Sequence, residues 1–203
     1  MDVLPAIGPR SHRAASLPAD ERRAAIAAAT LPLLLEHGSS VTTRQIAEAA
    51  GIAEGTIFRV FPDKDSVILA AVELAFDTQG ITRAIESIDR SLPLEERLVQ
   101  AVALIQERTA RIFQLMSVVS TMPNAGQGPP VPRKPPPDID GFVELIEPDA
   151  ALLRRDPHAV VQVLRALTFG GTHPMFITGE PLTPAEIVSL ALDGVRAHPR
   201  KDS

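Results

Sequence analysis

The sequence contains no cysteine, tryptophan or tyrosine, and seven phenylalanines are its only aromatic residues besides histidine. The lack of cysteine excludes disulfides, thiolate zinc sites and thiol nucleophiles. The scarcity of aromatic side chains argues against the stacking platforms that bind RNA or single-stranded nucleic acid. No apolar run reaches the roughly 18–20 residues that a membrane helix needs. We therefore expect a cytoplasmic protein that is not associated with a membrane.

Motifs for catalysis or metal binding are also missing. No nucleophile elbow, phosphate-cradling loop or zinc-protease motif occurs, and neither His158 nor His173 has a partner at ligand spacing. The sequence thus predicts a protein that is not an enzyme and that carries no metal or cofactor.

The net charge of −5 is unevenly distributed along the 203 residues. Residues 1–64 contain seven basic and seven acidic side chains and are neutral, so the remaining residues carry the whole negative charge. If this chain binds nucleic acid, its affinity must come from individually placed contacts rather than from bulk attraction.

Helical periodicity dominates the chain, and no stretch alternates with the period of a strand, so we predict an all-α fold. The expected helices cover residues 18–37, 42–50, 53–60, a long segment from Asp63 toward Ile88, 94–122, 139–146, 156–169 and 183–197. Gly38 should end the first helix, and Pro32 should kink its last turn. The Gly/Pro-rich stretch 170–184 is expected to form a loop between the last two helices, with Gly170 and Gly171 at a helix end.

Two segments stand apart in composition. Residues 1–16 are polar and unpatterned, and we interpret them as a disordered arm. Residues 123–137 contain seven prolines and favour an extended linker. A P-x-x-P motif in that linker is an alternative docking site for a proline-recognising domain.

The most informative stretch is residues 42–64. Thr42 and Gln45 form the pattern of a capping box, and Gly51 can adopt the left-handed conformation that turns the chain between two helices. Ile46, Ile57 and Phe61 should point inward, and small residues around the turn allow the two helices to meet closely. This is the geometry of a helix-turn-helix, whose second helix enters the major groove of DNA. The alternative is a helical corner in an unrelated protein.

The run TTRQIAEAAGIAEGTIFRVFPDKDSVILAAVE at residues 42–73 resembles the DNA-binding domain of the tetracycline-repressor (TetR) family, and the helix before it is also similar to that family's first helix. The resemblance covers about residues 18–76. It implies a three-helix DNA-binding head over residues 17–64 and a helical effector-binding and dimerisation body over residues 65–203, with about nine helices in all. The partners it implies are an operator in double-stranded DNA, a second copy of the chain and a small-molecule effector.

The resemblance also implies where DNA would be contacted. The residues that match the family's DNA-facing positions lie at the start of the second helix, on the recognition helix and at the start of the fourth helix: Thr42, Thr43, Arg44, Glu54, Gly55, Thr56, Phe58, Arg59 and Lys64. Arg59 has an alternative partner in Glu54 or Asp63. Lys64 would hold a phosphate, since a lysine beside the positive end of a helix needs a nearby anion.

The sequence departs from the family pattern at three positions in or beside the recognition helix. Ala53 lacks the hydroxyl of a helix cap, and neither Phe58 nor Val60 can donate a hydrogen bond to a phosphate. Arg10, His12 and Arg13 in the arm either compensate by reaching the minor groove or form an ordinary tail. The departures leave open an alternative function, a helical sensor protein with weak or lost DNA binding.

Apolar side chains of the body are candidates for the wall of an effector cavity. They are Phe76, Phe113, Met116, Met122 and Phe142, and ordinary core packing is the alternative for each of them. The lack of tyrosine and tryptophan favours an aliphatic or acyl effector over a flat aromatic one. The expected function is that of a repressor released from a palindromic operator by a small apolar effector.

Overall fold

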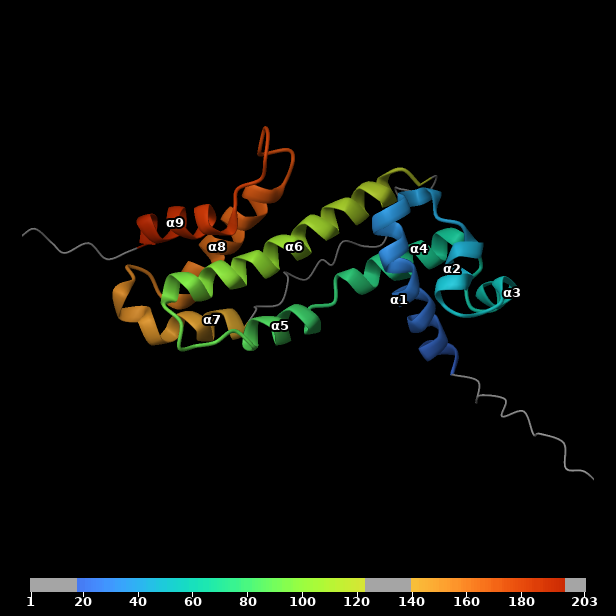
Figure 1. Cartoon of the computed structure of the whole chain (residues 1–203), viewed down its shortest axis with the longest axis horizontal. Helices are drawn as coiled ribbons and strands as arrows, with labels where there is room; N and C mark the ends of the chain where they lie inside the picture. Colours follow the sequence, from blue (N-terminus) through green and yellow to red (C-terminus); the bar gives the residue numbers. More distant parts are fainter. Residues whose placement is uncertain (1–17, 123–139, 196–203) are drawn as a thin grey trace, which may run out of the picture.

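The computed structural model describes residues 18–122 and 140–195, and every regular element within them is helical (Figure 1). The all-α prediction is therefore confirmed. The predicted arm at residues 1–16 and the proline-rich linker at 123–137 lie outside the described residues.

Four α-helices form the N-terminal region, which we call the head. They are α1 (Ala19–His37), α2 (Thr43–Ala49), α3 (Glu54–Ile57) and α4 (Lys64–Ala75), with a short 3₁₀ turn at Gly38–Ser40 after α1. Pro32 lies inside α1 without ending it. The helix instead ends at Gly38, whose φ of 59° is left-handed, as expected for a glycine stop.

The five remaining α-helices form the C-terminal region, which we call the body. They are α5 (Gln79–Glu86), α6 (Leu94–Ser120), α7 (Asp140–Ile146), α8 (Pro157–Thr172) and α9 (Pro184–Val195), and a 3₁₀ helix at Glu147–Leu152 follows α7. The 27-residue α6 runs along the molecule from the body to the head (Figure 1).

The segment from Asp63 toward Ile88 is not one helix, as its apolar pattern suggested. It breaks after Ala75, and α5 begins at Gln79, where the Asp77 carboxylate accepts the Gln79 backbone N–H at 3.2 Å. Aspartate competes for backbone donors in this way and favours helix ends over helix interiors.

The buried apolar residues form two separate clusters. The head cluster is built from α1 to α4 and includes Leu115, Val118 and Val119 from the C-terminal half of α6. The body cluster is built from α5, the N-terminal half of α6, and α7 to α9. The helix α4 contributes Val67, Ile68, Ala71 and Val72 to the head cluster, so the packing of the head extends beyond the predicted boundary at residue 64.

The end of α8 also differs from the prediction. Gly170 and Gly171 lie inside α8, which continues to Thr172, and His173 occupies the C-cap. A Cβ added at Gly171 would lie 3.2 Å from the Leu182 side chain. A side chain at position 171 would crowd Leu182, so Gly171 favours the close approach of the α8–α9 connection and does not end the helix.

Two features are absent from the described residues. None of the helices there is long and apolar enough to cross a membrane. No group of three or more potential metal-ligating side chains occurs in that part of the chain either.

Candidate nucleic-acid interface

The turn between α2 and α3 is built by local hydrogen bonds. The Gln45 backbone N–H donates to the Thr42 hydroxyl at 3.2 Å, and the Thr42 N–H donates to the Gln45 side-chain oxygen at 2.8 Å. The capping box predicted from the sequence is thus confirmed. Gly51 has a φ of 65°, and the Ile52 N–H donates to the Ala47 carbonyl at 3.0 Å. These contacts fix the direction in which α3 leaves α2.

The inward-facing residues hold the two short helices against the head cluster. Ile46, Ile57 and Phe61 are all essentially inaccessible to solvent, as predicted. The helix α3 is shorter than the expected 53–60, because its regular hydrogen bonding ends at Ile57 and the chain continues in turns to Val60. A helix of four residues is held in place by this burial and not by its own hydrogen bonds.

Arg23 adds a contact that the sequence did not reveal. Its guanidinium lies over the Phe61 ring at 4.3 Å from the ring centroid, and it donates to the Val60 carbonyl at 3.5 Å. This cation–π contact secures the chain after α3 against α1. Helical periodicity relates only residues a few positions apart, so it could not predict this contact between Arg23 and Phe61.

The outward-facing side of α2 and α3 carries two arginines without partners. Arg44, Gly55, Phe58 and Arg59 are exposed, and Phe58 has 51% of its surface accessible. Neither Arg44 nor Arg59 makes a side-chain hydrogen bond or ion pair with any described residue, so the alternative pairing of Arg59 with Glu54 or Asp63 is not observed. Their guanidinium donors are free to bind phosphate or a base edge.

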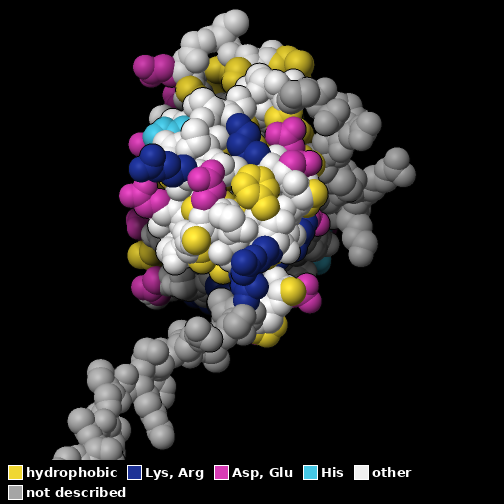
Figure 2. Space-filling model, turned by 90° about the vertical axis from the view of Figure 1, so that its right-hand side faces the viewer, with side chains coloured by type: hydrophobic (Ala, Val, Ile, Leu, Met, Phe, Trp, Pro, Cys, Tyr) yellow, Lys and Arg dark blue, Asp and Glu magenta, His cyan; other side chains and the backbone are white. Residues whose placement is uncertain are grey.

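Acidic side chains lie among these arginines. Figure 2 shows the end of the molecule formed by the head, where Lys and Arg side chains alternate with Asp and Glu. Glu54 accepts a short hydrogen bond from the Thr43 hydroxyl, which ties the start of α2 to the start of α3. The Thr43 hydroxyl therefore already has a partner within the protein. Thr56 on α3 is half-buried.

Lys64 has partners that the sequence argument did not anticipate. Its ammonium donates to the carbonyls of Ser39 and Val41 at 3.0 and 3.2 Å. The positive charge of Lys64 thus lies against carbonyl dipoles between α1 and α2. These carbonyls stabilise the charge without an external anion. Two of the three Lys64 donors are used, so one remains for a phosphate.

Asp63 caps α4 beside Lys64. The Asp63 carboxylate accepts the Ser66 backbone N–H at 2.7 Å. Hydrogen bonds from Ser66 to the ionised carboxylate lower the pKa of Asp63 below its ordinary value. The residues 63–66 thereby form a helix start that strengthens when Asp63 is charged.

The five side chains predicted to line an effector cavity are not brought together. Phe142 is buried in the body cluster, whereas Met122 is buried in the head cluster and Phe76 packs against that cluster. Phe113 packs against Phe169 and His173 with ring centroids 5.0 and 4.3 Å apart. Met116 is half-buried on α6. None of the five lines the cavity of about 360 Å³ found between α1, α4, α5 and α6.

Comparison with known proteins agrees with this geometry. Residues 26–71, which span most of α1 through α4, match the model of a family described as bacterial regulatory proteins, tetR family. This segment of the chain is therefore similar to the regulators of the TetR family. The match covers the helix-turn-helix and the helices that support it, so the DNA-binding motif of the TetR family is the part of the chain that carries the likeness.

A curated relative is the HTH-type transcriptional regulator HbdR of Aromatoleum sp. (strain CIB), which is 37% identical to this chain over 86 residues. The match covers 41% of this chain and 36% of the relative, so it spans about a third of that protein's length.

Solved structures extend the likeness in fold to most of the chain. A TetR transcriptional regulator from Streptomyces coelicolor is 19% identical with a TM-score of 0.54, covering 86% of this chain and 98% of that one. A TetR-family regulator from Mesorhizobium loti is 16% identical with a TM-score of 0.54, covering 90% and 100% of the two chains. At these identities the agreement concerns the fold alone.

Proposed function

We propose that this chain is a homodimeric transcriptional repressor of the TetR type that binds a palindromic operator and is released from it by a small effector. Two copies of α3 related by a two-fold axis would enter successive major grooves, about 34–36 Å apart. Thr42, Thr43, Arg44, Glu54, Gly55, Thr56, Phe58, Arg59 and Lys64 are the residues proposed to face the DNA.

The observation that carries this proposal is the pair of exposed, unpartnered arginines on the helix-turn-helix. A guanidinium presents donors in a planar fork that matches phosphate or the major-groove edge of guanine. Arg44 at the start of α2 is suited to a backbone phosphate, and Arg59 after α3 is suited to a base. Gly55 leaves open space on the same side, which permits close approach of the DNA.

The proposed dimer is supported by apolar side chains left exposed on the last two helices. Phe169 on α8 is 48% accessible and Leu190 on α9 is 56% accessible. Such residues are expected where α8 and α9 pack against the same helices of a second copy in a four-helix bundle. Light scattering at micromolar concentration should give the mass of a dimer, and a monomer would contradict this part of the proposal.

DNA binding is tested by a shift assay with the DNA that flanks the chain's own gene, at two salt concentrations. The wild-type protein should bind with a Kd that rises with salt. Arg59→Ala should lower the affinity for the operator about 10- to 100-fold and relax the sequence preference. Lys64→Ala should weaken binding to all sequences alike. Equal binding by wild type and both variants would overturn the proposed mechanism, and no shift at either salt would favour a sensor without useful DNA affinity.

A further inference from the structure

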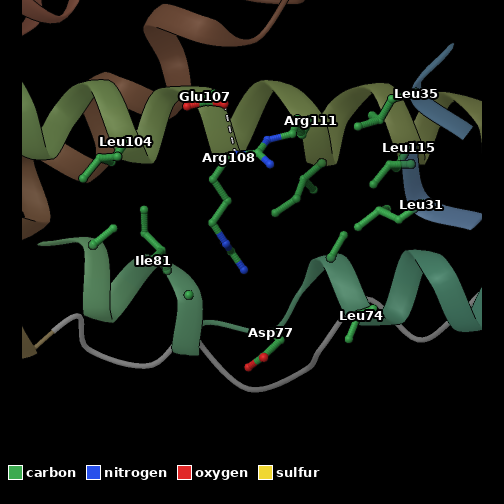
Figure 3. A pocket seen from close by; sticks show the side chains of 14 residues that line it. Leu31, Leu35, Leu74, Asp77, Ile81, Leu104, Glu107, Arg108, Arg111 and Leu115 are labelled. Carbon is green, nitrogen blue, oxygen red and sulfur yellow. Dashed lines mark ion pairs between the residues drawn. The ribbon is translucent and has the colours of Figure 1, made fainter. Parts of the chain in front are cut away.

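A cavity lies at the junction of head and body. It has a volume of about 360 Å³, is partly open to solvent, and is bordered by α1 and α4 of the head, by α5 of the body and by the middle of α6 (Figure 3). This volume is at the lower end of the range for small-molecule sites, roughly 300–1,000 Å³. Because both regions contribute to its walls, a molecule bound there would contact head and body at once.

The walls of the junction cavity are largely aliphatic. Leu31 comes from α1, Leu74 from α4, Ile81 from α5, and Leu104 and Leu115 from α6. No aromatic side chain lines the cavity. An elongated hydrocarbon chain fits such walls better than a flat ring, which would find no stacking partner.

One charged side chain extends into this apolar space. Arg108 leaves α6 and points across the cavity toward the link between α4 and α5, where Asp77 lies (Figure 3). Its guanidinium is half-buried and donates to the Phe76 carbonyl at 2.9 Å. No ion pair within 4.0 Å is found between Arg108 and Asp77. Most of the five guanidinium donors therefore have no protein acceptor.

The other charges around Arg108 do not neutralise it. Glu107 pairs with Arg111 at 3.2 Å on the same helix, and that pair is drawn as a dashed line in Figure 3. Burial lowers the pKa of Arg108. Of the nearby charges, Asp77 raises this pKa, and Arg111 and Arg165 lower it, so the net shift is downward. A half-buried cation with cationic neighbours is stabilised when an anion joins it.

We propose that the junction cavity binds a small monocarboxylate with an aliphatic tail, with Arg108 binding the carboxylate and the leucine and isoleucine side chains enclosing the tail. A single guanidinium matches one carboxylate in a bidentate geometry. Asp77 and Glu107 at the rim disfavour a ligand of higher negative charge.

The hydrogen bond between Arg108 and the Phe76 carbonyl connects the cavity to the head. This part of the inference rests on the proposed repressor function. Arg108 holds the carbonyl of Phe76 at the end of α4, while Lys64 holds the start of α4 against Ser39 and Val41 of the head. A carboxylate bound to two parallel donors of Arg108 would reorient the guanidinium and so weaken its hydrogen bond to the Phe76 carbonyl. Binding would thus loosen the C-terminal anchor of α4 and change the position of the head relative to the body.

Ligand binding is tested without DNA, by calorimetry of the full chain with decanoate, decanol and decylamine. Decanoate should bind at least about 10-fold more tightly than decanol, since a hydrogen bond to a charged group is of that order. Arg108→Gln should remove this preference, and Arg83→Gln on α5, outside the cavity, should keep it. Ala84→Leu, which fills the cavity without changing charge, should weaken decanoate binding as well.

Several outcomes would overturn the proposed ligand class. They are equal affinity for decanoate and decanol, tighter binding of decylamine, unchanged binding by Arg108→Gln, or no binding of straight-chain carboxylates from hexanoate to dodecanoate at millimolar concentration. Thermal unfolding of each variant checks that it is folded, and Arg108→Lys, which retains the charge, should keep part of the preference.

A second measurement separates this inference from the repressor proposal. If the DNA flanking the gene is bound, decanoate should weaken that binding for wild type and Arg83→Gln but not for Arg108→Gln. If bound decanoate left the affinity for DNA unchanged, that result would contradict the proposed role of Arg108 in holding the end of α4. Carboxylate binding by a chain that never binds DNA would contradict the repressor function and leave the ligand site intact.

Discussion

The head and the body use their arginines differently. In the body, Arg97 is 2% accessible, donates to the Leu145 carbonyl at 2.6 Å and pairs with Asp149. In the head, Arg44 and Arg59 are exposed and have no partner among the described residues. The paired Arg97 stabilises the fold of the body, whereas the unpaired Arg44 and Arg59 remain available to bind a ligand at the head.

Removing the carboxylate that pairs with the buried Arg97 should have the largest effect on stability. Asp149→Ala leaves the buried Arg97 without its counter-ion, and we expect the free energy of unfolding to fall by about 3–5 kcal/mol. The matched control is Glu144→Ala, which breaks the exposed pair with Arg90 and should cost about 1 kcal/mol or less. Urea unfolding followed by circular dichroism measures both, and equal losses would show that burial of Arg97 is not important.

Two glycines of the helix-turn-helix should respond in opposite directions. Gly51→Ala places a side chain at a φ of 65° and should destabilise the head by about 1–2 kcal/mol. Gly55→Ala lies in α3 with open space around it and should stabilise the protein by about 0.5–1 kcal/mol. Gly55→Ala should nevertheless weaken DNA binding. Thermal unfolding and a shift assay on both variants test this, and tighter DNA binding by Gly55→Ala would contradict the proposed approach of α3 to DNA.

Neutralising one acidic side chain should strengthen the head's affinity for DNA. Glu54→Gln keeps an acceptor for the Thr43 hydroxyl and removes one negative charge from the proposed interface. We expect a gain of roughly 1 kcal/mol or less in binding to any DNA sequence. The control is Glu180→Gln on an exposed connection of the body, which should leave the Kd unchanged. Weaker binding by Glu54→Gln would mean that the carboxylate itself contributes to the interface.

The smallest expected effect concerns acid. Because hydrogen bonds from Ser66 lower the pKa of Asp63 in the folded state, its stabilising contribution is complete above the unfolded value near 3.9 and is lost as the pH falls through the folded value. Asp63→Asn keeps a capping acceptor but cannot titrate. Its stability should therefore fall less between pH 5 and pH 2 than that of wild type, as measured by thermal unfolding across this range. Parallel curves would contradict the prediction.

The head was largely predictable from sequence because its contacts are local. The Thr42–Gln45 capping box, the left-handed Gly51 and the buried Ile57 all follow from spacing over a few residues. The contacts missed in the head are long-range in sequence. Arg23 reaches Phe61, and Lys64 reaches Ser39, across 25 or more positions.

The body was predictable only at the level of its helices. Periodicity located α6, α8 and α9, but it missed the break at Asp77 and the inclusion of Gly171 in α8. The apolar residues that were candidates for a pocket separate into different clusters, while the cavity lies where α4, α5 and α6 meet. Which apolar side chains line a cavity depends on the angles between helices, and hydrophobic spacing does not specify those angles.

The most direct test of the account is the salt dependence of DNA binding for arginines of the two regions. Arg44→Ala removes an unpaired charge from the head, and Arg155→Ala removes an exposed charge from the body. The slope of log K against log salt should fall by about 1 for Arg44→Ala and stay at the wild-type value for Arg155→Ala. Equal slopes for Arg44→Ala and wild type would contradict the claim that the free arginines of the head bind the DNA backbone.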